Sequence, residues 1–242
     1  MGDTIVWISG ATGGIGASLL RHVPYPNARI INLDIRDAAG CENVRFDLTD
    51  PASWDAVAAH FADELARFKG RRAVFLQNAF VQAGMGVIGK IDRDGYRTSL
   101  TANFVAPLML GEAFLRAATP GYELGLMMMS SGSALGRIGQ SAYGAAKAGI
   151  EKWVEVARQE FSTRPDTWIV AVRPGLVRTA TALRGADLPA EIYPRAGVLK
   201  EKFATHGVEA DLAGARIWKA LPPKPGRPLI SFDDSTTEQA TI

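Results

Sequence analysis

Short β-rich runs alternate with helical patterns along the chain, and this rhythm constrains the fold more than any other feature. Between the runs, apolar residues such as Trp54, Val57, Phe61 and Leu65 recur three and four positions apart, which is the stripe of an amphipathic helix. The alternation predicts one doubly wound α/β domain, residues 1–242, with a parallel seven-stranded sheet flanked by helices. The seven runs are residues 4–9, 28–34, 43–48, 72–78, 123–131, 167–174 and 227–232.

The composition limits the classes of partner. The 242 residues are 47% hydrophobic, enough for a substantial core. The 27 basic and 25 acidic residues are spread without a basic block, so we expect no nucleic-acid partner. The N-terminal segment has no apolar run typical of a signal peptide or membrane span, which favours a cytoplasmic protein. A single cysteine, Cys41, and three scattered histidines predict neither a disulfide nor a metal site.

Four stretches depart from the regular pattern. Residues 179–206 are irregular but apolar, and we expect them to form a mobile flap over a substrate. The polar tail, residues 233–242, is expected to fray. The helical stretches near 102–118 and 141–162 carry apolar residues on more than one side, which indicates either deep core or a subunit interface. An interface there would make the protein a homodimer or homotetramer.

A glycine-rich turn follows the first run and opens the helical pattern 15–22. This is the context of a phosphate-binding βα turn, in which the backbone approaches a pyrophosphate at a helix N-terminus. The turn fits two registers, Gly10-x-x-x-Gly14-x-Gly16 and Gly10-x-x-Gly13-x-x-Gly16. It contains no Gly-Lys-Ser/Thr, which excludes a Walker-type nucleotide triphosphatase.

Two carboxylates end the next two runs. Asp34 lies eighteen residues after Gly16, where a carboxylate accepts the ribose hydroxyls of an adenosine and repels a 2′-phosphate. This favours NAD over NADP, although Arg36 could neutralise a 2′-phosphate. Asp47 is placed either to meet the adenine amino group or to serve as the N-terminal acid of a helix that starts at Pro51.

Tyr143 and Lys147 lie four residues apart at a helix start, so their polar ends project from one face. A free phenol titrates near pH 10. We expect the ammonium and a cationic nicotinamide to lower the pKa of Tyr143 towards neutrality. Tyr143 could then exchange a proton with a carbonyl oxygen during hydride transfer, with a serine from the preceding run donating a hydrogen bond to that oxygen.

Taken together, these motifs resemble the short-chain dehydrogenase/reductase family over most of the chain. The family pattern Thr-Gly-x-x-x-Gly-x-Gly occurs at 9–16 with serine in place of threonine. The resemblance implies a Rossmann-type fold in which Gly10, Gly14 and Gly16 are required and Gly13 is permissive. It also implies cofactor contacts from Gly10, Thr12, Gly13, Gly14, Ile15, Gly16, Asp34, Ile35, Asp47, Leu48, Asn78, Ala79, Tyr143, Lys147, Pro174, Gly175, Val177 and Thr179.

Three further segments carry the resemblance. The Asn-Asn-Ala-Gly motif appears at 77–80 with Phe80 in place of glycine, which adds bulk near the cofactor ribose. Asn103 matches the asparagine that completes an Asn-Ser-Tyr-Lys tetrad by holding a proton-relaying water. Residues 173–179 are similar to Pro-Gly-x-Val-x-Thr, which implies that the backbone of Val177 and the hydroxyl of Thr179 bind the carboxamide.

The serine can be assigned in two ways. The usual spacing of thirteen residues before the tyrosine selects Ser130, whereas the second position of the Ser-Ser pair selects Ser131. We favour Ser131, because the SSG triplet is similar to the sepiapterin- and benzil-reductase-like branch of the family. Ser133 is interpreted as loop lining.

The resemblance implies an NAD(P)-dependent oxidoreductase that interconverts a small or medium apolar ketone and a secondary alcohol. Arg178 and Arg184 are candidate anchors for an anionic substrate group. Extended relatives that modify sugar nucleotides are disfavoured, because they need a larger C-terminal region. The alternative from another class is a non-catalytic dinucleotide sensor on the same fold.

Overall fold

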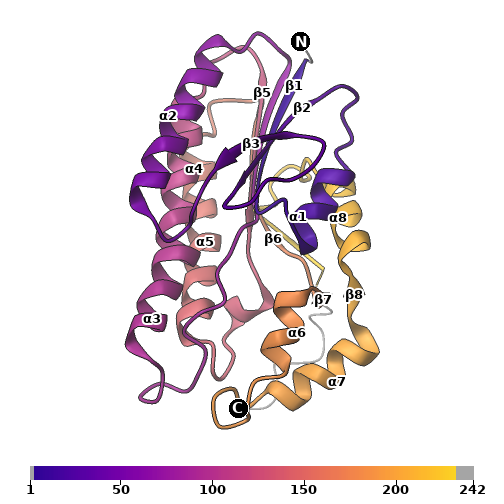
Figure 1. Cartoon of the computed structure of the whole chain (residues 1–242). Helices are drawn as coiled ribbons and strands as arrows, with labels where there is room; N and C mark the ends of the chain where they lie inside the picture. Colours follow the sequence, from indigo (N-terminus) through magenta and orange to yellow (C-terminus); the bar gives the residue numbers. More distant parts are fainter. Residues whose placement is uncertain (1–2, 233–242) are drawn as a thin grey trace.

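The computed structural model describes residues 3–232, and the tail predicted to fray lies outside the described residues. Its centre is a parallel sheet of seven strands in the order β3-β2-β1-β4-β5-β6-β9 (Figure 1). The predicted doubly wound parallel sheet is therefore confirmed. The strands are β1 Thr4–Ser9, β2 Arg29–Asp34, β3 Glu42–Arg45, β4 Arg72–Gln77, β5 Glu123–Met129, β6 Thr167–Arg173 and β9 Leu229–Ser231.

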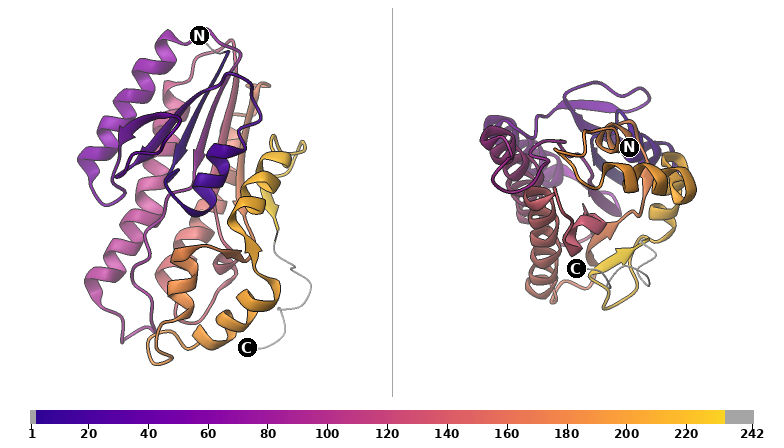
Figure 2. Two further views of the ribbon diagram at one scale, coloured as in Figure 1. Left: turned by 45° about the vertical axis from the view of Figure 1, so that its right-hand side comes forward. Right: turned by 90° about the horizontal axis from the view of Figure 1, so that it is seen from below.

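Helices cover both faces of the sheet (Figures 1 and 2). α2 (Pro51–Arg67), α4 (Ala106–Ala117) and α5 (Ser141–Glu160) lie on one face, and α1 (Gly14–Arg21) and α8 (Ala210–Lys219) on the other. The central strands read as continuous apolar runs because both of their faces are buried. Trp7, Phe61 and Phe114 meet edge to face in the larger core. No helix within residues 3–232 is long and apolar enough to cross a membrane.

The segment between β3 and α2 differs from the prediction. β3 ends at Arg45, and the chain then turns at Asp47, whose Oδ1 accepts from the Thr49 amide at 2.8 Å. The N-cap of α2 is Asp50, which accepts from Ala52 N at 3.1 Å, so the helix-capping interpretation of Asp47 was wrong.

The helix predicted at 102–118 begins earlier. α3 (Arg93–Leu100) is capped by Asp92, which accepts from Gly95 N at 2.7 Å. A π-helical turn, η1 (Thr101–Val105), connects α3 to α4 without a break. Such turns are rare and occur mostly as single-turn bulges inside α-helices.

The flap predicted at 179–206 has more regular structure than expected. It contains α6 (Ala180–Ala186) and α7 (Ala196–His206), and its flanks β7 (Val177–Arg178) and β8 (Val208–Glu209) pair in parallel. α6 starts at Thr179, whose hydroxyl oxygen accepts from Ala182 N at 3.1 Å. These helices are too short to show a clear period in the sequence. They form a lobe beyond the carboxyl end of the sheet (Figure 2).

α4 and α5 pack closely against each other, with Gly111 under the Trp153 ring and Gly149 under the Phe104 ring. Most of their apolar surface is deep core. Three apolar side chains remain about half exposed: Val105, Met109 and Val156. The subunit interface stays a prediction.

Candidate active site

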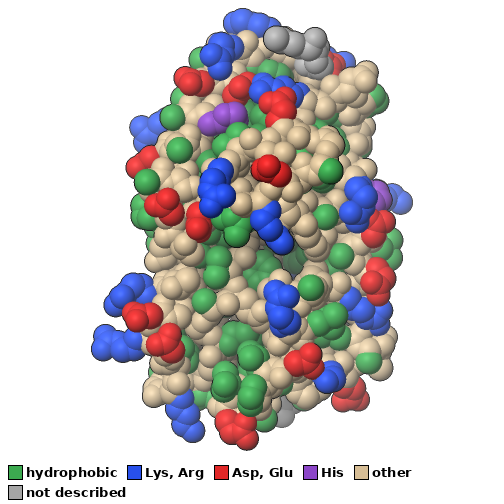
Figure 3. Space-filling view, viewed as in Figure 1, with side chains coloured by type: hydrophobic (Ala, Val, Ile, Leu, Met, Phe, Trp, Pro, Cys, Tyr) green, Lys and Arg blue, Asp and Glu red, His purple; other side chains and the backbone are tan. Residues whose placement is uncertain are grey.

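The parallel strands bring most of the predicted site residues to one edge of the sheet. The glycine turn, Asp34, Asn78, Ser131 and the 174–179 segment each follow the carboxyl end of a strand. In a doubly wound fold this edge forms the ligand crevice. Figure 3 shows the molecule hollowed near the centre of one face, with hydrophobic side chains gathered there and below it.

The backbone of the glycine turn distinguishes the two possible registers. Gly10 and Gly14 adopt left-handed φ values of +74° and +51°. A Cβ on Gly16 would lie 1.9 Å from the Gly10 carbonyl oxygen, whereas a Cβ on Gly13 would meet nothing within 4 Å. The predicted requirement for Gly10, Gly14 and Gly16, with Gly13 permissive, is confirmed.

The start of α1 fits a dinucleotide phosphate. Its N-cap, Gly13, makes no side-chain cap bond, and the first turn, which includes Ile15, carries no acidic residue. Helix N–H groups of this kind bind anions. Asn32 was missed by sequence reasoning: its Oδ1 accepts from Ala11 N at 3.1 Å and its Nδ2 donates to Arg36 O at 2.9 Å. It thereby fixes the turn to the end of β2.

At the predicted ribose position, Thr12 links two opposite charges. Its hydroxyl donates to Asp34 Oδ2 at 2.7 Å and accepts from Arg36 Nη2 at 2.7 Å. Ile35 lies between them in sequence and is 51% exposed. The position therefore presents both a carboxylate and a guanidinium.

The predicted adenine side is held by a compact turn. The carbonyls of Asp47 and Leu48 both accept from the Trp54 indole N–H at 3.2 Å. Asp47 Oδ1 also accepts from the Thr49 hydroxyl at 2.7 Å. The turn thus fixes the Asp47 carboxylate at the carboxyl edge.

The serine that replaces the family threonine organises the loop after β4. Ser9 Oγ accepts from Asn78 N at 2.9 Å and from Ala79 N at 3.0 Å, and Ser9 O accepts from Asn78 Nδ2 at 3.1 Å. Phe80, the departure from the family motif, lies with its ring centroid 6.0 Å from that of Tyr143. The replacement of the family glycine by Phe80 therefore places an aromatic ring beside Tyr143.

Asn103 lies in η1 and is fully buried. Its Oδ1 accepts from Val81 N and its Nδ2 donates to Val81 O, both at 2.8 Å. These bonds satisfy the amide and explain how a polar side chain is buried in an apolar helix. The side chain holds the loop after β4, and the water-holding role stays a prediction.

The segment after β6 also lies at the carboxyl edge of the sheet, with the other predicted site residues. Pro174 and Gly175 follow the strand directly, and Val177 is buried in β7. The Thr179 methyl would lie 3.0 Å from a Cβ on Gly14. The predicted carboxamide-binding residues therefore adjoin the phosphate turn.

Tyr143 and Lys147 project from one face of α5, as predicted. Lys147 is 1% exposed, and its Nζ donates to Met129 O at 2.8 Å and lies 5.5 Å from the centroid of the Tyr143 ring. Ser131 lies close enough to the Tyr143 hydroxyl to lower the pKa of the phenol. A phenol, a hydroxyl and an amine thus share one small region.

Burial dominates the electrostatics of this pair. It raises the pKa of Tyr143 to about 12, against which the hydrogen bond with Ser131 acts in the opposite direction. Burial also lowers the pKa of Lys147 to about 7. Our expectation that Lys147 lowers the pKa of the phenol is therefore wrong for the protein's own groups, because desolvation favours the neutral form of both.

The two candidate serines, Ser130 and Ser131, have different side-chain partners. Ser131 caps the short helix η2 (Gly132–Leu135) and reaches Tyr143. Ser130 is 1% exposed, and its Oγ donates to Glu151 Oε1 at 2.5 Å. Glu151 also accepts two hydrogen bonds from Arg173, both of 2.7 Å. The structure therefore brings Ser131, and not Ser130, to the tyrosine.

The pairing of Glu151 with Arg173 was missed by sequence reasoning. It joins α5 to the end of β6, so it fixes the helix of the tyrosine relative to the segment that starts at Pro174. A signal was present, because Glu151 lies four residues beyond Lys147 on the same helix face.

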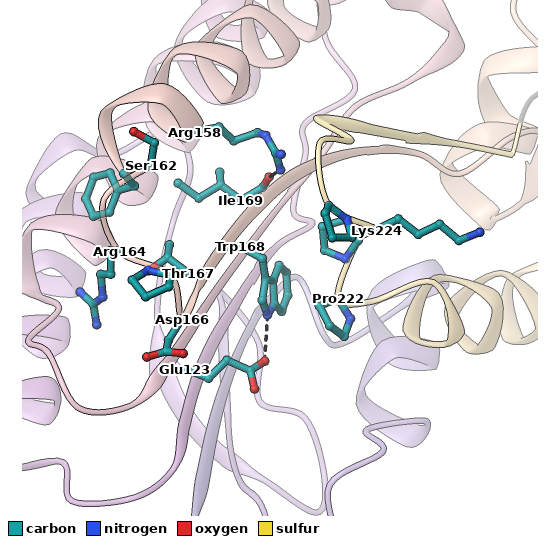
Figure 4. A pocket seen from close by; sticks show the side chains of 14 residues that line it. Glu123, Arg158, Ser162, Arg164, Asp166, Thr167, Trp168, Ile169, Pro222 and Lys224 are labelled. Carbon is teal, nitrogen blue, oxygen red and sulfur yellow. Dashed lines mark hydrogen bonds between the residues drawn. The ribbon is translucent and has the colours of Figure 1, made fainter.

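A cavity of about 560 Å³ lies at the opposite edge of the sheet, where β5 and β6 begin (Figure 4). Trp168 donates to Glu123 at 2.9 Å across it, and Pro222 and Lys224 line its other side. It contains none of the predicted site residues. Among residues 3–232 there is also no group of three or more His, Cys, Asp or Glu side chains that could hold a metal ion.

A phosphate-binding glycine turn and a Ser/Tyr/Lys group at the carboxyl edge of a doubly wound sheet define a dinucleotide-dependent oxidoreductase. The sequence pattern of the family described as short chain dehydrogenase matches residues 4–186. The chain belongs to this family, as predicted. Enzymes of the family use NAD or NADP to oxidise CH–OH groups or reduce carbonyl groups.

Three relatives illustrate the similarity. The cis-4-hydroxycyclohexanecarboxylate dehydrogenase of Sinomonas cyclohexanicum is 26% identical over 204 residues, which are 78% of each chain. The ligand-free aldohexose dehydrogenase of Thermoplasma acidophilum superposes with a TM-score of 0.78 at 18% identity, covering 96% of this chain and 92% of that one. A short chain dehydrogenase of Burkholderia cenocepacia in complex with NADP gives 0.74 at 18% identity, covering 96% and 97%.

Proposed function

We propose that the protein interconverts a small or medium apolar ketone and the corresponding secondary alcohol. The observation that carries this proposal is the placement of the buried Lys147 amine 5.5 Å from the centroid of the Tyr143 ring, with Ser131 close enough to Tyr143 to lower its pKa. Two hydroxyls held together in this way can both contact one carbonyl oxygen.

In the direction of reduction, Tyr143 donates its phenolic proton to the substrate oxygen, and Ser131 donates a hydrogen bond to the same atom. A bound dinucleotide supplies the hydride. Lys147, held by its bond to Met129 O, lies beside the Tyr143 ring, and Asn103 keeps the loop after β4 in place. In the direction of oxidation, Tyr143 takes the proton from the alcohol.

The cofactor residues that we propose follow the carboxyl edge. The helix N-terminus at Gly14 would hold the pyrophosphate, Asp34 the adenosine ribose, and Val177 and Thr179 the carboxamide. The other proposed contacts are Gly10, Thr12, Gly13, Ile15, Gly16, Ile35, Asp47, Leu48, Asn78, Ala79, Tyr143, Lys147, Pro174 and Gly175.

Apolar side chains beside Tyr143 and in the flap support an apolar substrate. Phe80 lies beside Tyr143, and Leu183 and Ile192 in the 179–206 flap are 42% and 44% exposed. A relative's name also denotes a secondary alcohol on a saturated ring. NADH oxidation with a panel of cyclic ketones, diketones and aryl ketones tests the proposal. Turnover is expected for at least one of these classes of ketone. Tight NADH binding without any turnover would instead favour the alternative function, a non-catalytic dinucleotide sensor.

We further propose NAD as the preferred cofactor, because Asp34 repels a 2′-phosphate. The Asp34→Ser variant is expected to gain at least about tenfold in NADPH affinity relative to NADH, since a full like charge is removed beside Arg36. Fluorescence titration of both cofactors measures the ratio. Asp37→Ser, three residues further along in the exposed loop, is the matched control. A wild-type protein that prefers NADPH would contradict the proposal.

The exposed apolar side chains of α4 and α5 support a homodimer or homotetramer. Met109→Lys is expected to release monomers, because a charge would then be buried in the interface. Light scattering at micromolar concentration checks this, with Leu135→Lys, on a different exposed surface, as control. A wild-type monomer at that concentration would rule out the interface.

A further inference from the structure

Two neighbouring strands, β5 and β6, separate where they reach the candidate site. Beyond their last pair, Ser130 N donates to Val172 O at 2.8 Å. From there one chain leads to Ser131, and the other leads through Arg173 to Pro174. The next bond of a parallel ladder would come from the backbone nitrogen of residue 174, but proline has no N–H. A further link between the two branches therefore has to come from side chains.

A carboxylate from α5 supplies this link. Glu151 Oε1 accepts from Ser130 Oγ at 2.5 Å and from Arg173 Nε at 2.7 Å, and Glu151 Oε2 accepts from Arg173 Nη2 at 2.7 Å. The side chains of this ion pair are largely buried, with exposed fractions of 16% for Glu151 and 11% for Arg173. Paired arginine–carboxylate bonds fix orientation as well as distance. Glu151 thus holds both branches at the point where they diverge.

The helix that carries this carboxylate also carries the candidate catalytic pair. Tyr143, Lys147 and Glu151 follow one another at intervals of four residues along α5. Lys147 Nζ donates to Met129 O at 2.8 Å, at the last residue of β5. α5 is therefore fixed to the end of β5 by Lys147 and to both branches by Glu151. The pair of Glu151 with Arg173 resists movement of the segment 174–179 relative to Tyr143.

We propose that Glu151 and Arg173 are positioning residues that set the nicotinamide half of a bound dinucleotide at the correct distance from Ser131 and Tyr143. They act through the segment 174–179, to which the proposed function assigns the carboxamide, so the inference rests on that function. The adenosine half is assigned to the residues that follow β1 and β2, and β4 and β5 separate these strands from β6. The pair should therefore affect one half of the cofactor and not the other.

ADP-ribose separates the two halves, because it keeps the adenosine and the pyrophosphate and lacks the nicotinamide. Glu151→Gln places an amide donor against the Arg173 guanidinium. NADH affinity should then fall about tenfold, the equivalent of part of one charge-assisted hydrogen bond, while ADP-ribose affinity stays unchanged. Arg173→Lys keeps the charge but loses the paired geometry, so a smaller effect in the same direction is expected. Calorimetric titration of the folded proteins with both ligands measures these affinities without turnover.

Two further variants serve as controls. Ser130→Ala keeps both bonds between Glu151 and Arg173, so the ratio of NADH affinity to ADP-ribose affinity should stay at its wild-type value. Glu155→Gln makes the same change one helical turn further along α5, where the carboxylate pairs with Lys152 at the surface. Neither affinity should change in this variant.

Three results would overturn the proposal. The first is an unchanged affinity ratio in folded Glu151→Gln or Arg173→Lys, and either variant alone suffices if the other does not fold. The second is an equal loss of NADH and ADP-ribose affinity, which a purely structural role would produce. The third is the failure of both variants to fold, which would assign the ion pair to stability alone.

The rate of hydride transfer supplies a second readout. In Glu151→Gln, kcat for ketone reduction should fall by up to about a hundredfold, because a small misplacement of the reacting groups can cost that much. The primary isotope effect with deuterated NADH should increase, since hydride transfer becomes slower relative to product release. If the wild-type protein turns over no ketone, the proposed function fails, while the affinity ratio still decides this inference.

Discussion

Tyr143→Phe is expected to lower kcat for carbonyl reduction by about 10²–10⁴-fold, the usual contribution of a general acid. The phenyl ring keeps the contact with Phe80, and the variant loses only the hydroxyl. NADH affinity should change little, because the phosphate turn is untouched. Steady-state NADH oxidation and a fluorescence titration of NADH measure the two effects separately.

Tyr25 provides the matched control for this prediction. It packs under the Arg72 guanidinium near the start of β4, at the edge of the sheet opposite the candidate site. Tyr25→Phe removes the same atom and should leave kcat unchanged. A Tyr143→Phe protein with wild-type kcat would show that the proton comes from another group.

Gly16→Ala is expected to lower the free energy of unfolding by about 3 kcal/mol, near the upper end of the cost of overpacking. The added Cβ would lie 1.9 Å from the Gly10 carbonyl oxygen, and backbone must move to admit it. Since that backbone forms the phosphate turn, dinucleotide affinity should fall as well. Chemical denaturation measures the first effect and NADH titration the second.

Gly13→Ala is the control three residues away. Gly13 has an extended φ of −166°, and a Cβ there would meet nothing within 4 Å. Its free energy of unfolding should change by less than about 1 kcal/mol, the range of glycine-to-alanine effects at compatible sites. Equal destabilisation by the two substitutions would contradict the structural account of the turn.

The sequence predicted those features that depend on local pattern. All seven strand runs correspond to strands of one parallel sheet. The inner strands β1, β4, β5 and β6 are continuous apolar segments because both of their faces are buried. The glycine register also followed from the sequence once the Tyr143 and Lys147 spacing indicated the family. These features involve residues that are close together in the chain or in a fixed order.

The features that were missed depend on contacts between distant segments. Spacing alone left Ser130 and Ser131 open and the SSG triplet favoured Ser131, but the pairing of Ser130 with Glu151 and of Glu151 with Arg173 could not be predicted. The pKa of Tyr143 was misjudged because the burial of Tyr143 and Lys147 is a tertiary property. The short helices of the flap were missed because their stability comes from packing and not from periodicity.

The π-helical turn Thr101–Val105 lies within one continuous helix that makes two specific contacts. On one side of the turn, Asn103 must face Val81, and on the other, Gly111 must admit the Trp153 ring. An unbroken α-helix advances about 100° per residue, so losing one residue here would rotate one half by that angle against the other. The π-helical turn therefore sets the rotation of α4 relative to α3 at which both contacts are made.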